Sequence, residues 1–411
     1  MIVGAILLIP LIQIGVSFWA SFASIITIAT IWKFRAAFAN NVPKYLHLYI
    51  AFMLMFLSIL SFHPKDFMQE VLRISREGMF FVLIVIAIYT FEHRNVIRRI
   101  DGAVVAVLCI SIAMFMISFI QMNSYKNGVY FGFPQDWFVT NQNTIANEND
   151  LIFTRENLRP SGTFGEPSYL AFIMLSFIFM LAPIARMSKI ASIAILMCIL
   201  TGAVSRSLAF FLSLPVVYFV PSFIEARISV KIRLIVVSVL LISVSFIFEP
   251  VMITVSRLSE VSAATGDVST FSRIVAPVLI LPEFIFTYPL GVAAENLADA
   301  VSPISRGLIP DVGEFFNNGF ANLFFEYGIV GFLLASIILR STSDIRVRCY
   351  ILYSSIFNGA FLHIDKVGIF ILTLAMYRAS KQVIFEESLG GSIKNRPRGK
   401  FSIKMAERNG A

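Results

Sequence analysis

Long apolar runs separated by short polar segments dominate the chain. The runs lie at 12–32, 45–62, 77–91, 103–121, 168–185, 190–205, 208–224, 233–248, 319–339, 349–362 and 366–384. Each run is near the roughly 20 residues that a helix needs to cross the hydrocarbon of a bilayer. The pattern therefore predicts an all-α, polytopic membrane bundle with 11 transmembrane helices.

The first 32 residues leave one alternative open. They carry no charged side chain, and Pro10 and Gln13 interrupt the apolar pattern. The segment is compatible with one long tilted helix or with a tight helical hairpin, which would give 12 transmembrane helices. Because no basic residue precedes the apolar run, we do not expect a cleaved signal peptide.

Composition supports the membrane class. Hydrophobic residues make up 57% of the chain and charged residues 14%, with a mean hydropathy of +0.81, whereas soluble domains carry about 25% charged residues. The cysteines Cys109, Cys198 and Cys349 all fall in apolar runs. We expect them to pack in the core and not to form a disulfide or metal site.

Lysine and arginine predict the orientation. The segments 33–44, 92–101, 186–189, 225–233, 340–348 and 378–411 would share one side, and they hold 22 of the 33 basic residues. Cytoplasmic loops carry such an excess, so the C-terminus is expected in the cytoplasm. Residues 1–385 would form one membrane domain, followed by a basic, disordered tail over 386–411 that contacts anionic lipid. The basic balance follows from topology and does not indicate nucleic acid.

This topology leaves two long loops on the outer side, at about 122–167 and 249–318. Loops held by a rigid scaffold often carry function. Within the second loop, prolines at 277 and 282 argue against an ordinary spanning helix. We therefore expect residues 271–287 to form an amphipathic helix on the outer surface.

Two arginine motifs border the outer side. Arg159 and Glu166 flank a glycine-containing turn directly before the run at 168–185. Arg206 lies between two serines and interrupts an apolar stretch from 190 to 223. It is predicted to sit in a tight outer turn, to bind an anion, or both, because a planar guanidinium suits bidentate phosphate contacts.

The remaining polar candidates follow later in the chain. Asn317 or Asn318 would cap the helix at 319–339, whose free amides attract anions. Glu326 is interpreted as a hydrogen-bonded structural carboxyl. His363 and Asp365 lie on another outer turn and are candidates for the same surface.

The motifs occur in an order that resembles the O-antigen polymerase and O-antigen ligase superfamily of bacterial envelope glycan assembly. The matching pieces cover about 155–340: Arg159 with Gly162-Thr163-Phe164-Gly165-Glu166-Pro167, Ser205-Arg206-Ser207, Arg273 with Pro289-Leu290-Gly291, and Asn318 with Gly328 and Gly331. The resemblance implies glycosyl transfer at the outer face of the inner membrane, from a polyprenyl diphosphate to a lipid-linked repeat unit. It also implies that Arg206, Arg273 and, less directly, Arg159 bind the diphosphate.

One departure bears on the branch of the superfamily. The ligase branch has a histidine proposed as the base where this chain has Asn317, which favours a polymerase. The acceptor hydroxyl must still lose a proton, and Glu166 is the first candidate for the base, followed by Glu314. Arginines and helix amides can stabilise the departing diphosphate, so no metal or cofactor is implied.

Two alternatives remain: a ligase-type transferase and a lipid-linked oligosaccharide flippase or transporter. A transporter would place polar groups at mid-membrane, whereas here charge gathers at one face. The expected partners are a polyprenyl-diphosphate-linked oligosaccharide, membrane lipid and other polysaccharide-assembly proteins, including a chain-length regulator.

Overall fold

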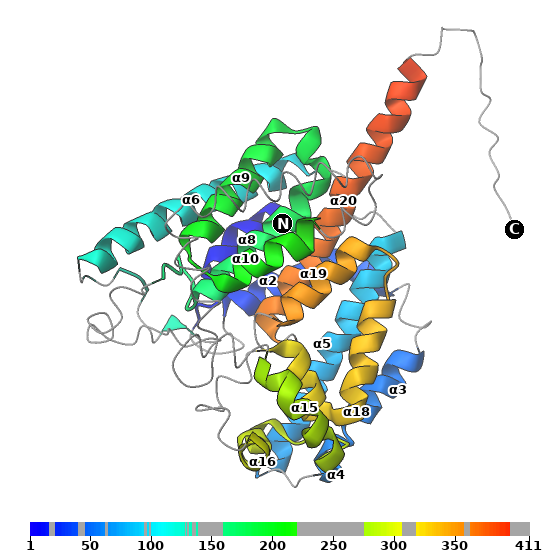
Figure 1. The fold of residues 1–411 in the computed structure, drawn as a ribbon. Coiled ribbons are helices and arrows are strands. Elements are labelled where there is room, and N and C mark those ends of the chain that lie inside the picture. Colours follow the sequence, from blue (N-terminus) through cyan, green and yellow to red (C-terminus); the bar gives the residue numbers. More distant parts are fainter. Residues whose placement is uncertain are drawn as a thin grey trace, which may run out of the picture.

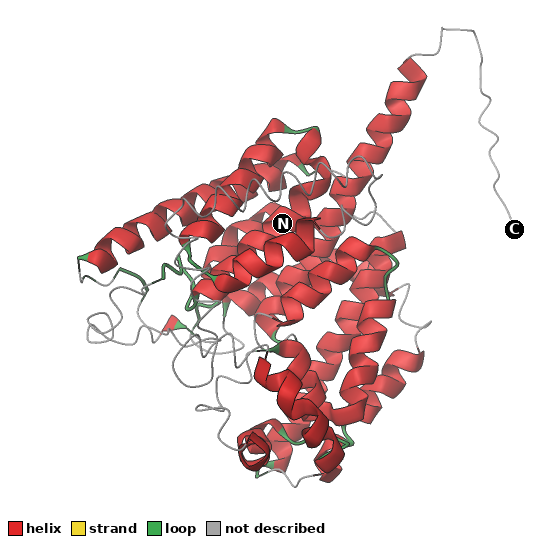
Figure 2. Cartoon of the chain, in the orientation of Figure 1, coloured by secondary structure: helices red, strands yellow, loops and turns green. Residues whose placement is uncertain are grey.

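The computed structural model describes residues 1–15, 21–39, 46–61, 65–93, 97, 100–127, 129, 131–133, 137–138, 159–219, 275–305, 318–356 and 362–394. Within these ranges the regular structure is helical, without a β-strand (Figure 2). The all-α fold expected from the apolar runs is therefore confirmed for the described part of the chain.

The described helices follow the apolar runs closely in several places and depart from them in others. Their bounds are α1 (Ile2–Leu8), η1 (Ile9–Leu11), α2 (Phe22–Ala39), α3 (Leu46–Met55), α4 (Ser58–Ser61), α5 (Phe67–His93), α6 (Asp101–Lys126), α8 (Pro167–Leu181), η4 (Ala182–Arg186), α9 (Lys189–Val204), α10 (Leu208–Leu214), η5 (Pro215–Phe219), α15 (Ala276–Thr287), η7 (Ala294–Asn296), α16 (Leu297–Ser305), α18 (Gly319–Arg340), α19 (Ile345–Ile356) and α20 (Ile364–Lys394).

Four of these helices are long and apolar enough to cross a membrane: Phe22–Ala39, Asp101–Lys126, Pro167–Ala185 and Gly319–Arg340. Shorter apolar helices cover Ile2–Leu11, His47–Leu60, Lys189–Val204 and Ala276–Thr287. The structure thus supports an integral membrane protein, and the predicted number of 11 or 12 spans stays a prediction. The predicted run at 233–248 lies outside the described residues.

The helices α5, α8, α18 and α20 begin at the same end of the bundle. Arg73, near the start of α5, pairs with Glu326 of α18, and Tyr169 at the start of α8 contacts Asp365 at the start of α20. We call the end where these helices begin the Asn318 end, after the residue that precedes α18. We call the opposite end, where α5 and α18 finish, the Arg340 end. There, Lys381 in the second half of α20 donates a hydrogen bond to Asp344, which lies just after α18.

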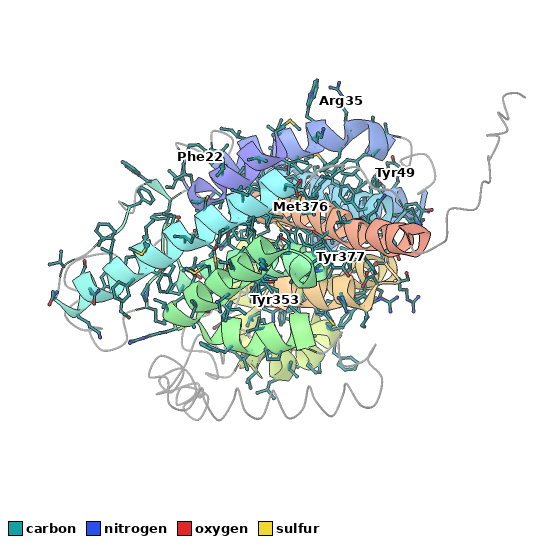
Figure 3. The ribbon with its side chains drawn as sticks, turned by 90° about the horizontal axis from the view of Figure 1, so that it is seen from above. Phe22, Arg35, Tyr49, Tyr353, Met376 and Tyr377 are labelled. Carbon is teal, nitrogen blue, oxygen red and sulfur yellow. The ribbon has the colours of Figure 1, made fainter. Side chains whose placement is uncertain are left out.

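The main core lies where α8 and α20 run side by side among their neighbours. Phe179 of α8 stacks on Tyr377 of α20 with ring centroids 4.3 Å apart, and on Tyr350 of α19 at 4.5 Å. Figure 3 shows Tyr377 and Tyr353 among these packed helices, while Arg35 points away at the edge. Every residue of α8 is buried, which makes α8 the central helix of the described bundle.

Among the described residues 1–15 and 21–39, α1 with η1 and α2 are separate helices that pack on each other, as expected for the hairpin alternative. At the Arg340 end, Val3 of α1 approaches Gly102 at the start of α6. At the Asn318 end, the carbonyl of Pro10 accepts a hydrogen bond from Thr163, and the chain then returns as α2. Pro10 ends the regular α-helix because its missing N–H and ring favour a helix start or turn.

Two expectations need correction. The run at 45–62 is not one helix, since turns at Phe56 and Leu57 separate α3 from α4. Cys109 does not pack in the core: its side chain is exposed on α6, while Cys198 and Cys349 are buried. In addition, α20 continues to Lys394, so helix extends into the segment predicted as a tail.

A second apolar cluster joins α15 and α16 to the first half of α18 (Figure 1). Phe284 of α15 meets Phe325 of α18 edge-on, with centroids 4.6 Å apart. On the other side of α15, Val278, Leu279 and Phe286 are exposed. The exposed side of α15 thus combines these apolar side chains with Glu283 and Thr287.

Candidate functional site

The turn at 161–165 is held in place by buried amide side chains. Gln121 of α6 accepts hydrogen bonds from the backbone N–H groups of Ser161 and Gly162, at 3.1 and 2.9 Å, and donates to the Gly162 carbonyl at 2.7 Å. Gln13 accepts from the Gly165 N–H at 2.9 Å. Gly162 has a φ of 66°, a region that favours glycine. The turn is therefore a fixed element and not a flexible linker.

Glu166 is the N-cap residue of α8, followed by Pro167 at the first helical position. Its carboxylate accepts a hydrogen bond from the Ser168 hydroxyl at 2.8 Å. Glu166 and Arg159 are both half-buried. Both precede α8, which begins at the Asn318 end of the bundle. Neither residue is isolated, since each makes further interactions.

Arg206 lies in the tight turn predicted between two apolar helices. Ser205 is the C-cap residue of α9, and Ser207 is the N-cap residue of α10. Arg206 itself has a φ of 51°, an uncommon conformation for a residue with a Cβ. It is 7% exposed, and its Nε has no hydrogen-bond partner among the described residues. Such an orphaned buried donor is costly and suits a site that receives an acceptor.

Two of the sequence motifs pack directly on each other at a kink in α18. Gly328 has φ 54° and ψ −130°, which interrupts the helix. The Pro289 carbonyl accepts a hydrogen bond from the Ile329 N–H at 2.9 Å, and the Val292 N–H donates to the Phe325 carbonyl at 3.0 Å. A Cβ on Gly291 or on Gly328 would overlap the facing backbone. The turn after α15 thus fits into the kink.

Asn318 is confirmed as the N-cap residue of α18. Its side-chain oxygen accepts a hydrogen bond from the Ala321 N–H at 3.0 Å, which satisfies one of the free amides at the helix start. At the start of α20, His363 Nδ1 lies 2.8 Å from Asp365 Oδ1. Both residues sit at the Asn318 end, as do the turn at 159–166 and Arg206.

A buried ionic cluster at the same end was not predicted from the sequence. Arg73 pairs with Glu70 through two hydrogen bonds of 2.9 and 2.6 Å, and also with Glu77 at 2.9 Å and with Glu326. Tyr327 donates to Glu77 at 2.6 Å. The cluster confirms that Glu326 is a hydrogen-bonded carboxyl. The signal that could have found it is the i, i+3, i+7 spacing of three charges, which places them on one helical face.

Five predicted site residues lie in turns or at helix starts assigned to the Asn318 end of the bundle: Arg159, Glu166, Arg206, Asn318 and His363. Arg273, Glu314 and Asn317 lie outside the described residues. Their assignments as diphosphate ligand, base and substrate contact stay predictions.

The comparison with known families decides the class of the protein. The sequence profile of WcaD colanic acid polymerase matches residues 1–379. The chain belongs to this family. Membership supports a polysaccharide polymerase of exopolysaccharide synthesis, consistent with the resemblance of its motifs to O-antigen polymerases. No curated protein and no protein of known structure shows significant similarity to the chain.

Proposed function

We propose that this protein extends a bacterial exopolysaccharide by transferring the growing glycan from a polyprenyl diphosphate to a sugar hydroxyl of the next lipid-linked repeat unit. The reaction takes place at the outer face of the inner membrane, and the C-terminus lies in the cytoplasm. The WcaD family match supports the polymerase class. The donor, the acceptor and the side of the membrane are the parts that we add.

The observation that carries the proposal is the environment of Arg206. Its side chain is buried, and its Nε lacks a partner within the described ranges. A positive φ holds the residue in the turn between α9 and α10. A folded protein tolerates this combination of strain and an unsatisfied donor where a ligand completes the site. A diphosphate offers the oxygens that a guanidinium fork prefers.

The chemistry requires stabilisation of the leaving group. As the bond between the anomeric carbon and the donor phosphate breaks, negative charge develops on the polyprenyl diphosphate. A buried guanidinium aimed at that charge acts in a low dielectric, where its effect is much larger than in water. We assign this role to Arg206, with Arg273 and Arg159 as further cations for the same diphosphate.

The arrangement of the bundle supports an active site at one membrane face. The predicted site residues that the structure describes gather at the Asn318 end, whereas Lys33, Arg35, Lys189 and Arg340 lie toward the Arg340 end. An excess of basic residues marks the cytoplasmic side. The Asn318 end would then face outward, where flipped lipid-linked units are found.

Substitution of Arg206 tests the proposal. Arg206→Ala and Arg206→Lys should both insert, and cells carrying them should accumulate single lipid-linked repeat units on the outer face of the inner membrane. Lysine keeps the charge but not the planar fork, so we expect partial activity from Arg206→Lys. Lipid extraction and mass spectrometry measure the length of the linked glycan.

The matched control is Arg35→Ala, since Arg35 is an exposed arginine stacked 3.6 Å over the Trp32 ring at the other end of the bundle. It should leave polymer length unchanged. Repeat units trapped on the inner face in the Arg206 variants would contradict polymerisation and favour a flippase. Full-length polymer from Arg206→Ala would contradict the role of Arg206.

A further inference from the structure

His363 and Asp365 form a side-chain pair at the start of α20. His363 Nδ1 lies 2.8 Å from Asp365 Oδ1, and the Asp365 side chain is 2% exposed while that of His363 is 28% exposed. The His363 carbonyl accepts hydrogen bonds from the N–H groups of Lys366 and Val367, each at 3.0 Å. The backbone that carries the imidazole is therefore fixed to the first turn of a long helix.

The backbone around the pair is hydrogen-bonded to two neighbouring helices, α8 and α2. Tyr169 of α8 points its hydroxyl at the Asp365 carbonyl at 3.4 Å, and Thr27 of α2 donates to the Ile364 carbonyl at 2.9 Å. Tyr169 lies one turn after Glu166, whose carbonyl accepts from the Tyr169 N–H at 3.1 Å. Tyr169 thus links the first turn of α8, which follows Glu166, to the first turn of α20, which follows His363.

This geometry determines which imidazole nitrogen can accept a proton. An ionised carboxylate only accepts hydrogen bonds, so the nitrogen that meets Asp365 carries the ring proton. The Nε2 atom of the neutral ring is then the basic one, and a buried carboxylate stabilises the imidazolium that forms after proton uptake. A histidine with an intrinsic pKa near neutrality is suited to general base catalysis.

We propose that His363 is the general base of the polymerase reaction and that Asp365 is its positioning residue. This inference rests on the proposed function above. The O–H bond of the acceptor sugar breaks, and its proton passes to His363 Nε2. The acceptor oxygen bonds to the anomeric carbon of the donor glycan, while the carbon–oxygen bond to the diphosphate breaks. The electron pair leaves with the polyprenyl diphosphate at Arg206.

Glu166 is the competing candidate for the same role. Its carboxylate accepts a hydrogen bond from the Ser168 hydroxyl at 2.8 Å and stands at the N-terminus of α8. Both features tie the Glu166 carboxylate to the first turn of its own helix. His363 is instead held at Nδ1 by Asp365, an arrangement that makes Nε2 the proton-accepting nitrogen of the neutral ring. We therefore assign proton removal to His363 and not to Glu166.

The test uses the full-length protein in detergent and lipid-linked repeat units extracted from cells that lack the polymerase. Initial rates of chain extension are measured against the concentration of these units. His363→Ala and the bulkier His363→Gln should lower kcat about 10²–10⁴-fold, the usual contribution of a general base. KM for the lipid-linked unit should change little, because the base acts in the chemical step.

Addition of imidazole to His363→Gly distinguishes a catalytic role of His363 from a purely structural one, because only a missing base can be replaced by imidazole from solution. We expect it to restore part of the rate in His363→Gly and none in Asp365→Asn, which still carries its histidine. The matched control is His93→Ala, because His93 is an exposed histidine at the Arg340 end of α5. It should keep the wild-type rate.

The outcomes separate this inference from the proposed function. Failure of the wild-type protein to extend the units would refute the transfer reaction and the base with it. Extension by the wild type and by His363→Ala at similar rates would refute the base alone. So would a normally inserted, thermally stable His363→Gly protein that imidazole does not rescue, particularly if Glu166→Gln alone abolished the rate.

Discussion

Gly328 faces the carbonyl oxygen of Pro289 so closely that a Cβ atom on Gly328 would overlap it. This contact joins the kink of α18 to the turn that follows α15. Gly328→Ala should therefore destabilise the protein and reduce polymer formation. The positive φ alone costs roughly 1–3 kcal/mol for a residue with a side chain. A fall in the thermal unfolding temperature in detergent would measure the effect.

Gly4→Ala is the control for that substitution. Gly4 lies in α1 and has open space where a Cβ would be placed, and alanine favours a helix by about 1 kcal/mol over glycine. Its unfolding temperature should be unchanged or higher. Equal losses in the two variants would show that the kink has no special requirement for glycine.

The buried ionic cluster should respond strongly to loss of its cation. Arg73→Met leaves Glu70, Glu77 and Glu326 without their guanidinium partner. Breaking a buried ion pair in this way typically costs about 3–5 kcal/mol. The double variant Arg73→Met/Glu326→Gln should recover part of that loss, which a double-mutant cycle on unfolding temperatures would detect.

An exposed ion pair gives the comparison. Lys65 and Asp299 pair at 3.1 Å with side chains 67% and 66% exposed, and such pairs contribute about 0–1 kcal/mol. Lys65→Met should thus leave stability almost unchanged. If Arg73→Met lowered stability no more than Lys65→Met, the carboxylates of the cluster would have to be hydrated, because an unpaired carboxylate is costly only where water is excluded.

Gln121 should be essential for the turn at 161–162. Its amide satisfies two backbone N–H groups and one carbonyl of that turn, and Gln121 is 1% exposed. Gln121→Leu has a similar size but leaves these groups unpaired, at roughly 1–3 kcal/mol each. We expect reduced activity and faster hydrogen exchange over 159–166. Gln69→Leu, at an exposed position of α5, should show neither change.

The contacts of Asp344 with Lys381 and Tyr377 at the Arg340 end should weaken in acid. Burial would raise the pKa of its carboxyl, but hydrogen bonds from Lys381 at 2.9 Å and Tyr377 at 3.0 Å, together with the Arg346 N–H, hold that pKa below its usual 3.8. Because the folded pKa is lowered, the stabilisation is present above about pH 4. It is lost as the pH falls through the folded pKa.

Asp344→Asn should therefore lower the unfolding temperature at neutral pH and remove part of its decline in acid. Unfolding temperatures measured between neutral pH and pH 3 would check this. An identical pH profile for wild type and variant would contradict the assignment of that decline to Asp344.

The apolar pattern predicted the bounds of several helices closely. The runs at 168–185, 190–205 and 319–339 begin and end within a few residues of α8, α9 and α18. The start of α5 was taken as loop because Glu70, Arg73 and Glu77 interrupt its hydrophobicity. Their burial depends on Glu326 in a distant helix, and no local pattern encodes that contact.

The candidate site was likewise predicted only in part, because some of its contacts join residues that are distant in the sequence. Arg206 and Glu166 were selected because they interrupt or precede apolar runs. The cap of the helix at 319–339 was predicted as Asn317 or Asn318, and the structure shows Asn318. The sequence placed His363 next to Asp365, but the burial of Asp365 and its contact with Tyr169 arise from the packing of α8 against α20. Tertiary contacts of this kind become visible only in the folded chain.

The cluster around Arg73 also has a consequence for the order of assembly. Glu326 follows Arg73 by 253 residues, so at about 5–20 residues per second the ribosome needs roughly 10–50 s to supply it. During that time Arg73 of α5 must do without Glu326. Glu70 and Glu77, three residues before and four after Arg73 on the same helical face, provide carboxylate partners within α5 itself. Once α18 is synthesised, Glu326 also pairs with Arg73. The arginine would then have a carboxylate partner both before and after α18 packs against α5.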